Sequence, residues 1–373
     1  CAVVSFCIGS SWTVVGTIGI GMMGIARATD MDPAITAGAV ISGAYLGDTV
    51  SPLSDSVNLA AGVAGVNLYD HIREVAITSS VALIIALFVF WMLGRPADFD
   101  TAAELAAMAG AFDISLVLFL PLVLVVALAL LKLPPFTTIF LGAIAACLVA
   151  VVFSPERVIA FADATGRELP DWLLLVKGVW QAFATGYVST TGIADIDQLL
   201  SRGGMESMLD TIWLVIAALA FGGVVEEAGV IDRLINPVIE RVRSAGVLVA
   251  SMVASVLATA ALTADQYIAI VLPGRMFKGA FAARGMAPLM LSRTAGASAT
   301  PTSALIPWNS CGAYMAATLG VATTSYAPYA VFNMASPLIV TALALVGFRT
   351  LRGGVSETAP VVQPESPDPA PPV

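Results

Sequence analysis

Charge is scarce in this chain of 373 residues, since only 12% of them are Asp, Glu, Lys or Arg. A soluble globular domain carries about twice that fraction. The longest uncharged stretch, residues 294–348, contains no Asp, Glu, Lys, Arg or His. A helix needs about 20 apolar residues to cross the hydrocarbon core of a bilayer. The sequence therefore argues against a soluble protein with an apolar core and predicts an all-α, polytopic membrane protein.

Metal-binding side chains are scarce as well. The chain has a single histidine, and its four cysteines stand singly in apolar segments: Cys1, Cys7, Cys147 and Cys311. No cysteine pair has the spacing of a metal site, so we expect free thiols and no cofactor. No basic cluster indicates nucleic-acid binding. The lipid bilayer is the expected partner, and the sequence predicts a protein that is not an enzyme.

Segment 43–66, GAYLGDTVSPLSDSVNLAAGVAGV, carries two carboxylates, Asp48 and Asp55, in an otherwise uncharged stretch with Pro52 between them. Broken backbone is tolerated at membrane depth only where it lines a cavity. Carboxylates within a span are functional candidates by default. Neighbouring polar side chains would add oxygen ligands for a small hard cation: Ser51, Ser54 and Asn58.

These carboxylates could couple a cation to protons. Burial raises the pKa of a carboxyl group and a nearby cation lowers it, so a proton and a cation compete for the same oxygens. We expect the first half-helix to end near Gly47 and the second to run through about Gly65. The alternative is that Asp48 and Asp55 cap restarting half-helices, and capping does not exclude ion binding.

An internal repeat pairs this segment with another. Pro52 and Pro307 are 255 residues apart, and Gly65 matches Gly320 at the same interval. Paired discontinuous helices in repeats are typical of secondary transporters. The alternative is two unrelated broken helices. Thr13 joins the candidate Na⁺ and H⁺ site from the polar tip of an earlier break, and the repeat extends the site to Asp265, Thr300, Ser303, Asn309 and Ser310.

The repeat also predicts the domain organisation. Residues 1–110 would form the C-terminal part of a first repeat, 111–352 a second repeat, and 353–373 a disordered Pro-rich tail. On this reading the first repeat begins roughly 140 residues before the first residue given. The loop after residue 94 is acidic, whereas Arg349 and Arg352 follow the equivalent span. Because positive charge marks the cytoplasmic side, the repeats are expected to be inverted.

Several long motifs resemble the NhaC-type Na⁺/H⁺ antiporter family. They are SSWTVVGTIGIGMMGIA at 10–26, GAYLGDTVSPLSDSVNLAAGVAGVNLYDHIRE at 43–74, LAFGGVVEEAGV at 219–230, DQYIAIVLPGRMF at 265–277 and SALIPWNSCGAYMAATLGVATTSYAPYAVFN at 303–333. The resemblance implies inverted repeats with re-entrant hairpins and broken helices. Similar members usually carry an acidic pair where this chain has Gly296 and Ala297, a departure that puts the coupling stoichiometry in question.

The expected function is therefore Na⁺/H⁺ exchange by alternating access in the inner membrane, with Na⁺ as the transported ion. The resembled family also includes carriers of malate, lactate and amino acids, so a coupled organic-acid or amino-acid carrier is the alternative. A channel is disfavoured by the paired broken helices. A homodimer is a possible partner state, since dimers are common among transporters of similar architecture.

Overall fold

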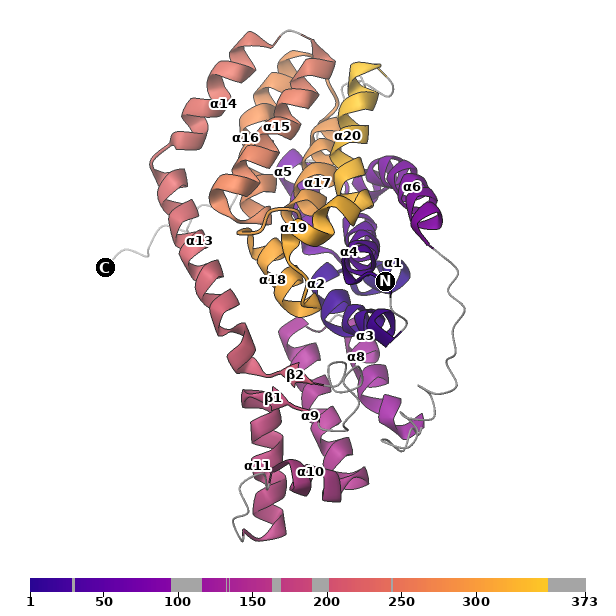
Figure 1. The fold of residues 1–373 in the computed structure, drawn as a ribbon. Coiled ribbons are helices and arrows are strands. Elements are labelled where there is room, and N and C mark those ends of the chain that lie inside the picture. Colours follow the sequence, from indigo (N-terminus) through magenta and orange to yellow (C-terminus); the bar gives the residue numbers. More distant parts are fainter. Residues whose placement is uncertain are drawn as a thin grey trace, which may run out of the picture.

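The computed structural model describes residues 1–28, 31–94, 116–131, 133, 135–162, 169–189, 201–242 and 244–347. The described residues do not include the acidic loop 95–113, Arg349, Arg352 or the tail 353–373. Figure 1 shows a helical body with α8 to α11 below the other helices. The all-α class is confirmed, with one two-residue antiparallel pairing between β1 and β2.

The elements, in chain order, are α1 (Ala2–Ile8), α2 (Ser11–Val14), the π-helix η1 (Val15–Gly19), α3 (Ile20–Ala28), α4 (Pro33–Val50), α5 (Asp55–Ala64), α6 (Leu68–Leu93), η2 (Leu116–Phe119), α8 (Leu120–Leu130), α9 (Pro135–Phe153), α10 (Pro155–Ala162), α11 (Asp171–Ala184), β1 (Gly186–Tyr187), β2 (Arg202–Gly203), η3 (Met205–Met208), α13 (Leu209–Glu227), α14 (Val230–Arg241), α15 (Ala245–Thr263), α16 (Gln266–Ala283), α17 (Pro288–Ser303), α18 (Ser310–Leu319), α19 (Thr323–Tyr326), η4 (Ala327–Tyr329) and α20 (Val331–Leu345).

Within the described ranges, three helices are long and apolar enough to cross a membrane: Leu68–Leu93, Met205–Glu227 and Ala245–Thr263. Two helix pairs add candidate spans that are bent at a short break. α9 and α10 meet at 103°, and α19 with η4 meets α20 at 59°. Bent and broken helices of this kind fit the expected polytopic membrane protein.

Helix boundaries recur at the interval of 255 residues. The recurring starts are Ser11 and Gln266, Pro33 and Pro288, Asp55 and Ser310, and Leu68 and Thr323. Local chemistry explains why. Pro33 and Pro288 both occupy the first helical turn, where the missing N–H has no helical partner. Gly65 and Gly320 both end their helices with a left-handed backbone, at φ 73° and 67°.

Close contacts join the two halves. α5 packs against α17, because a Cβ built on Gly296 would lie 3.4 Å from Cβ of Ala60. The π-helix η1 lies between α4 and α18, because a Cβ built on Gly19 would lie 3.0 Å from Val40 and 3.5 Å from Leu319. The inverted orientation of the repeats stays a prediction.

The break in the first half begins later than the sequence analysis predicts. α4 continues past Gly47 to Val50, and the break covers residues 51–54. The helical conformation is disfavoured for a residue that precedes proline. Ser51, directly before Pro52, is accordingly extended, at φ −81° and ψ 133°. Proline, and not the carboxylate of Asp48, sets the position of the break.

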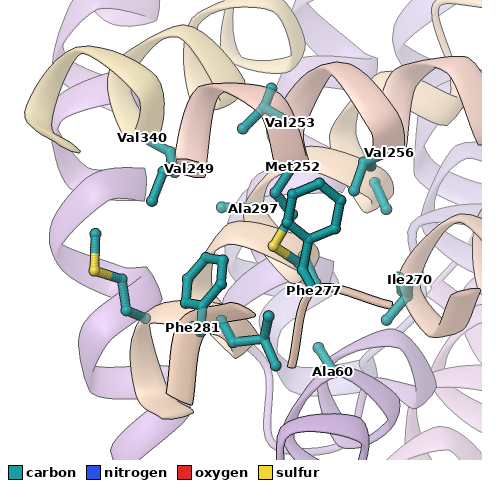
Figure 2. Close-up of a cluster of buried hydrophobic side chains, with 14 of the residues drawn as sticks. Ala60, Val249, Met252, Val253, Val256, Ile270, Phe277, Phe281, Ala297 and Val340 are labelled. Carbon is teal, nitrogen blue, oxygen red and sulfur yellow. The ribbon is translucent and has the colours of Figure 1, made fainter. Parts of the chain in front are cut away.

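Buried apolar side chains form two clusters. The first joins α15, α16, α17 and the end of α20, and Figure 2 shows Met252, Phe277, Ala297 and Val340 within it. The second joins α4 to the C-terminal part of the chain through residues such as Tyr45 and Phe332. Both clusters combine residues from the two halves, so the halves pack as one body.

Candidate functional site

The two broken segments meet around a cavity of about 760 Å³. Its wall includes the first turns of four helices, α2, α5, α16 and α18, and the last turn of α4. Five of the residues expected at the site line this cavity: Thr13, Asp48, Asp55, Asp265 and Ser310. The wall therefore draws on both halves of the repeat.

Asp48 is buried in the last turn of α4 and accepts three hydrogen bonds. Ser11 donates from its backbone N–H at 3.2 Å and from its hydroxyl at 2.6 Å to one oxygen. Ser54 donates its hydroxyl to the other oxygen at 2.5 Å. Asp48 thus does not cap the restarting helix α5, as the capping alternative supposes, but accepts the first N–H of α2. Its donors suit an ionised carboxylate.

Asp55 is the first residue of α5 and is exposed, with its side chain on the cavity wall. Ser54, and not Asp55, occupies the N-cap position, and the Ser54 side chain makes no capping bond. A carboxylate in the first turn is favoured by the partial positive charge of the helix N-terminus. Asp55 therefore presents its carboxylate to the cavity. Hydrogen-bond donors enclose Asp48 but do not enclose Asp55.

The second half contributes one carboxylate and several neutral groups. Asp265 caps α16 by accepting from the N–H of Ile268 at 2.8 Å. Gln266 accepts at Oε1 from the hydroxyl of Ser303 at 3.2 Å and from the thiol of Cys311 at 3.3 Å. The site is asymmetric, because Ser303 stands at the repeat position of Asp48. Among the described wall residues there is no Lys, Arg or His.

Three expected residues of the first half lie behind the wall and hold the break in shape. Ser51 donates its hydroxyl to the carbonyl of Phe6 at 2.7 Å. Asn58 donates its amide to the carbonyls of Pro52 and Ser54, at 3.2 and 2.8 Å. These groups fix the unwound backbone, and Ser54 orients Asp48 from behind.

The expected residues Thr300, Ser303 and Asn309 play the same part in the second half. The carbonyl of Thr300 accepts from the Ser303 hydroxyl at 2.7 Å. Asn309 caps α18 by accepting from the N–H of Cys311 at 3.0 Å, and donates to the carbonyl of Ala260 at 3.0 Å. They support the break from outside the cavity.

Among the wall residues outside the predicted site, four pair up in the repeat: Ser11, Ser56, Gln266 and Cys311. The repeat interval itself was the available signal. Gln266 stands at the repeat position of Ser11, and Cys311 at that of Ser56. The hydrogen bond from Ser11 to Asp48 consequently has a counterpart between Ser303 and Gln266.

An aromatic pair joins the halves beside the cavity. The rings of Trp12 and Tyr314 stack with centroids 4.2 Å apart and planes 7° apart. The Tyr314 hydroxyl also donates to the backbone carbonyl of Trp12 at 3.2 Å. Trp12 lines the cavity, so this contact lies where the two halves close over it.

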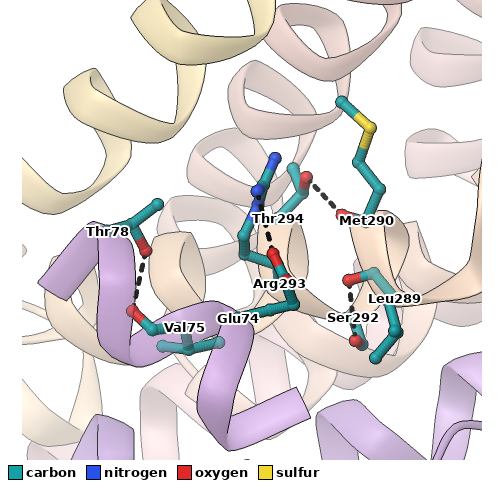
Figure 3. A network of polar contacts seen from close by, with 8 residues as sticks. All are labelled: Glu74, Val75, Thr78, Leu289, Met290, Ser292, Arg293 and Thr294. Atoms are coloured by element: carbon teal, nitrogen blue, oxygen red, sulfur yellow. Dashed lines mark hydrogen bonds and ion pairs between the residues drawn. The ribbon is translucent and has the colours of Figure 1, made fainter. Parts of the chain in front are cut away.

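A second polar cluster lies away from the cavity. Arg293 of α17 is 1% exposed and pairs with Glu74 of α6 at 3.4 Å, as Figure 3 shows. A Cβ on Gly296 would lie 3.2 Å from the ring of His71, and Ala297 is buried in the apolar core. Neither position lines the cavity. The missing acidic pair therefore leaves the carboxylates of the cavity wall unchanged.

Comparison with known proteins agrees with this architecture. The model of the Na⁺/H⁺ antiporter family matches residues 43–348. The chain belongs to this family. It is 36% identical over 351 residues to the Na⁺/H⁺ antiporter NhaC of Alkalihalophilus pseudofirmus, covering 93% of this chain and 72% of that protein. A chain of this family is a transporter.

Two further relatives carry other names. The arginine/ornithine antiporter ArcD of Halobacterium salinarum is 34% identical over 355 residues, covering 93% of this chain and 70% of ArcD. The malate-2H⁺/Na⁺-lactate antiporter of Bacillus subtilis is 32% identical over 336 residues, covering 88% and 68%. Family membership alone therefore leaves the solute to be argued from the cavity.

Proposed function

We propose that this chain exchanges Na⁺ for H⁺ across the inner membrane by alternating access. The observation that carries the proposal is the acidic cavity where the two halves meet. Three carboxylates, Asp48, Asp55 and Asp265, line it, and no described wall residue is basic. Such a wall attracts a cation. The similarity to NhaC antiporters supports Na⁺ as that cation.

The proposal gives the carboxylates different roles. Asp55 and Asp265 sit at helix N-termini on the cavity wall and attract Na⁺ from the aqueous side. Asp48, enclosed by Ser11 and Ser54, binds the dehydrated ion with help from those hydroxyls. A proton and Na⁺ compete for the same oxygens, and this competition couples their movements.

An organic-acid carrier is disfavoured by the same wall. Malate or lactate would place its carboxylate beside three carboxylates with no described cationic side chain to pair with it. A carrier of amine-bearing solutes remains the second candidate, because the cavity is much larger than a bare ion needs. Trp12 and Tyr267 on its wall also offer aromatic faces to an organic cation.

Transport by the reconstituted full chain tests the proposal. A pH gradient is imposed on proteoliposomes, and uptake of radioactive Na⁺ is compared with uptake of malate, lactate, arginine and ornithine. We expect proton-coupled Na⁺ flux that is lost in Asp55→Asn and retained in Asp70→Asn, an exposed control on α6. Proton-coupled movement of an organic solute without Na⁺ flux would refute the primary proposal.

A further inference from the structure

Three buried side-chain oxygens have no hydrogen-bond partner where α15, α17 and α20 pack together. They are Oγ1 of Thr259, Oγ of Ser298 and Oδ1 of Asn333, and each residue is 0% exposed. Leaving such a group unsatisfied costs about 1–3 kcal/mol. In native structures an unsatisfied buried group calls for an explanation, such as an ordered water or an ion. None of these residues lines the acidic cavity.

The three residues lie at the same depth in the helices. Thr259 is one turn from the end of α15, and Ser298 is little more than one turn from the end of α17. Both ends lie at the first turn of α18, because the N–H of Ser310 donates to the carbonyl of Ala264 and a Cβ built on Gly312 would lie 3.5 Å from the carbonyl oxygen of Ala304. Asn333 is held beside α17, since its amide donates to the carbonyl of Pro301 at 2.8 Å. All three helices contact one another.

The hydroxyls of Thr259 and Ser298 differ from those of their neighbours on the same helices. A buried Ser or Thr in a helix commonly donates to the carbonyl four residues earlier. Thr263 does so to Thr259 at 2.8 Å, and Thr302 does so to Ser298 at 2.6 Å. The hydroxyls of Thr259 and Ser298 make no such bond. These hydroxyl oxygens are therefore free to bind a water molecule or an ion between the helices.

Two prolines each free a helical carbonyl at this junction, and only one of these carbonyls receives a side-chain donor. Proline has no N–H, so the carbonyl four residues earlier loses its helical donor. For Pro301 the freed carbonyl is that of Ala297, and Ser336 satisfies it at 2.6 Å. For Pro337 the freed carbonyl is that of Asn333, and no described side chain donates to it. Asn333 thus offers both a backbone and a side-chain oxygen.

We propose that these oxygens form a second Na⁺ site, distinct from the acidic cavity and made of neutral ligands only. Hydroxyl, amide and carbonyl oxygens suit a hard cation, and without a carboxylate the site suits a monovalent ion better than Ca²⁺ or Mg²⁺. The nearby C-termini of α15 and α17 add partial negative charge. Figure 2 shows the apolar surroundings at Val256, Ala297 and Val340, which exclude bulk water.

This proposal depends on the proposed function in one respect, which is the choice of Na⁺ as the bound ion. Binding of radioactive Na⁺ to the purified full chain tests it. We expect Thr259→Val and Ser298→Ala each to remove one bound Na⁺ per chain, while Thr259→Ser retains it. Thr263→Val is the matched control on α15, because its hydroxyl is already satisfied by its own helix. Stoichiometry unchanged by Thr259→Val and Ser298→Ala would overturn the proposal and assign the oxygens to buried water.

A second arm separates this site from the acidic cavity. In the Asp48→Asn, Asp55→Asn double variant we expect residual Na⁺ binding that Ser298→Ala abolishes. Loss of all Na⁺ binding in the double variant would overturn the neutral site and leave the proposed exchange standing. Na⁺ binding that depends on Ser298, in a chain whose proteoliposomes show no Na⁺/H⁺ exchange, would support the site and refute the proposed function.

Discussion

Replacing the two carboxylates of the first break one at a time should change the stability of the protein and its transport rate to different extents. Asp48 is buried and accepts three hydrogen bonds, two from Ser11 and one from Ser54. Asp55 is exposed in the first turn of α5. The substitutions Asp48→Asn and Asp55→Asn preserve shape and remove one charge each, so any difference between them reports on the surroundings.

The expected magnitudes follow from these surroundings. In Asp48→Asn an NH₂ group replaces one oxygen. The amide can keep its oxygen on the N–H and hydroxyl of Ser11 and turn its NH₂ to Ser54, whose hydroxyl then accepts. All three bonds lose their charge assistance, so the free energy of unfolding should fall by about 1–3 kcal/mol. Asp55→Asn loses only its interaction with the helix N-terminus, about 0.3–1 kcal/mol.

Thermal unfolding in detergent and Na⁺ flux in proteoliposomes measure the two effects. Asp48→Asn should lower the unfolding temperature clearly, and Asp55→Asn should leave it near that of the parent chain. Both should slow Na⁺/H⁺ exchange at least about tenfold, equivalent to 1.4 kcal/mol. Asp70→Asn, on the exposed part of α6, serves as the control. Equal unfolding temperatures for Asp48→Asn and the parent chain would refute the reasoning.

Three further changes test other parts of the fold. Arg293→Met should cost about 3–5 kcal/mol by removing the cation that pairs with Glu74, and adding Glu74→Leu should recover most of it, as chemical unfolding would report. A double-mutant cycle of Trp12→Ala and Tyr314→Ala should give a coupling of about 0.5–1.5 kcal/mol, and additive effects would contradict the stack. Ala264→Gly should raise the unfolding temperature, because φ at Ala264 is 57°, a conformation that costs an L-residue about 1–2 kcal/mol.

Much of the candidate site could be predicted because its signals are local. Pro52 and Pro307 mark the breaks, and two carboxylates in an uncharged segment stand out in any membrane sequence. Five expected residues do line the cavity. The end of α4 was placed three residues too early, because the carboxylate of Asp48 looked like the end of the helix. Asp48 accepts a hydrogen bond from Ser11, which is 37 residues away, and no local pattern shows this contact.

The sequence by itself determined the membrane class, the repeat interval and the positions of the breaks. Each depends on composition or on backbone chemistry within a few residues, as proline, glycine and uncharged runs do. Only the tertiary structure decided which polar groups face the cavity and which support it from behind. It also decided that Arg293 pairs with Glu74, 219 residues earlier in the chain. Such pairings depend on how the two halves pack, and no local pattern encodes that geometry.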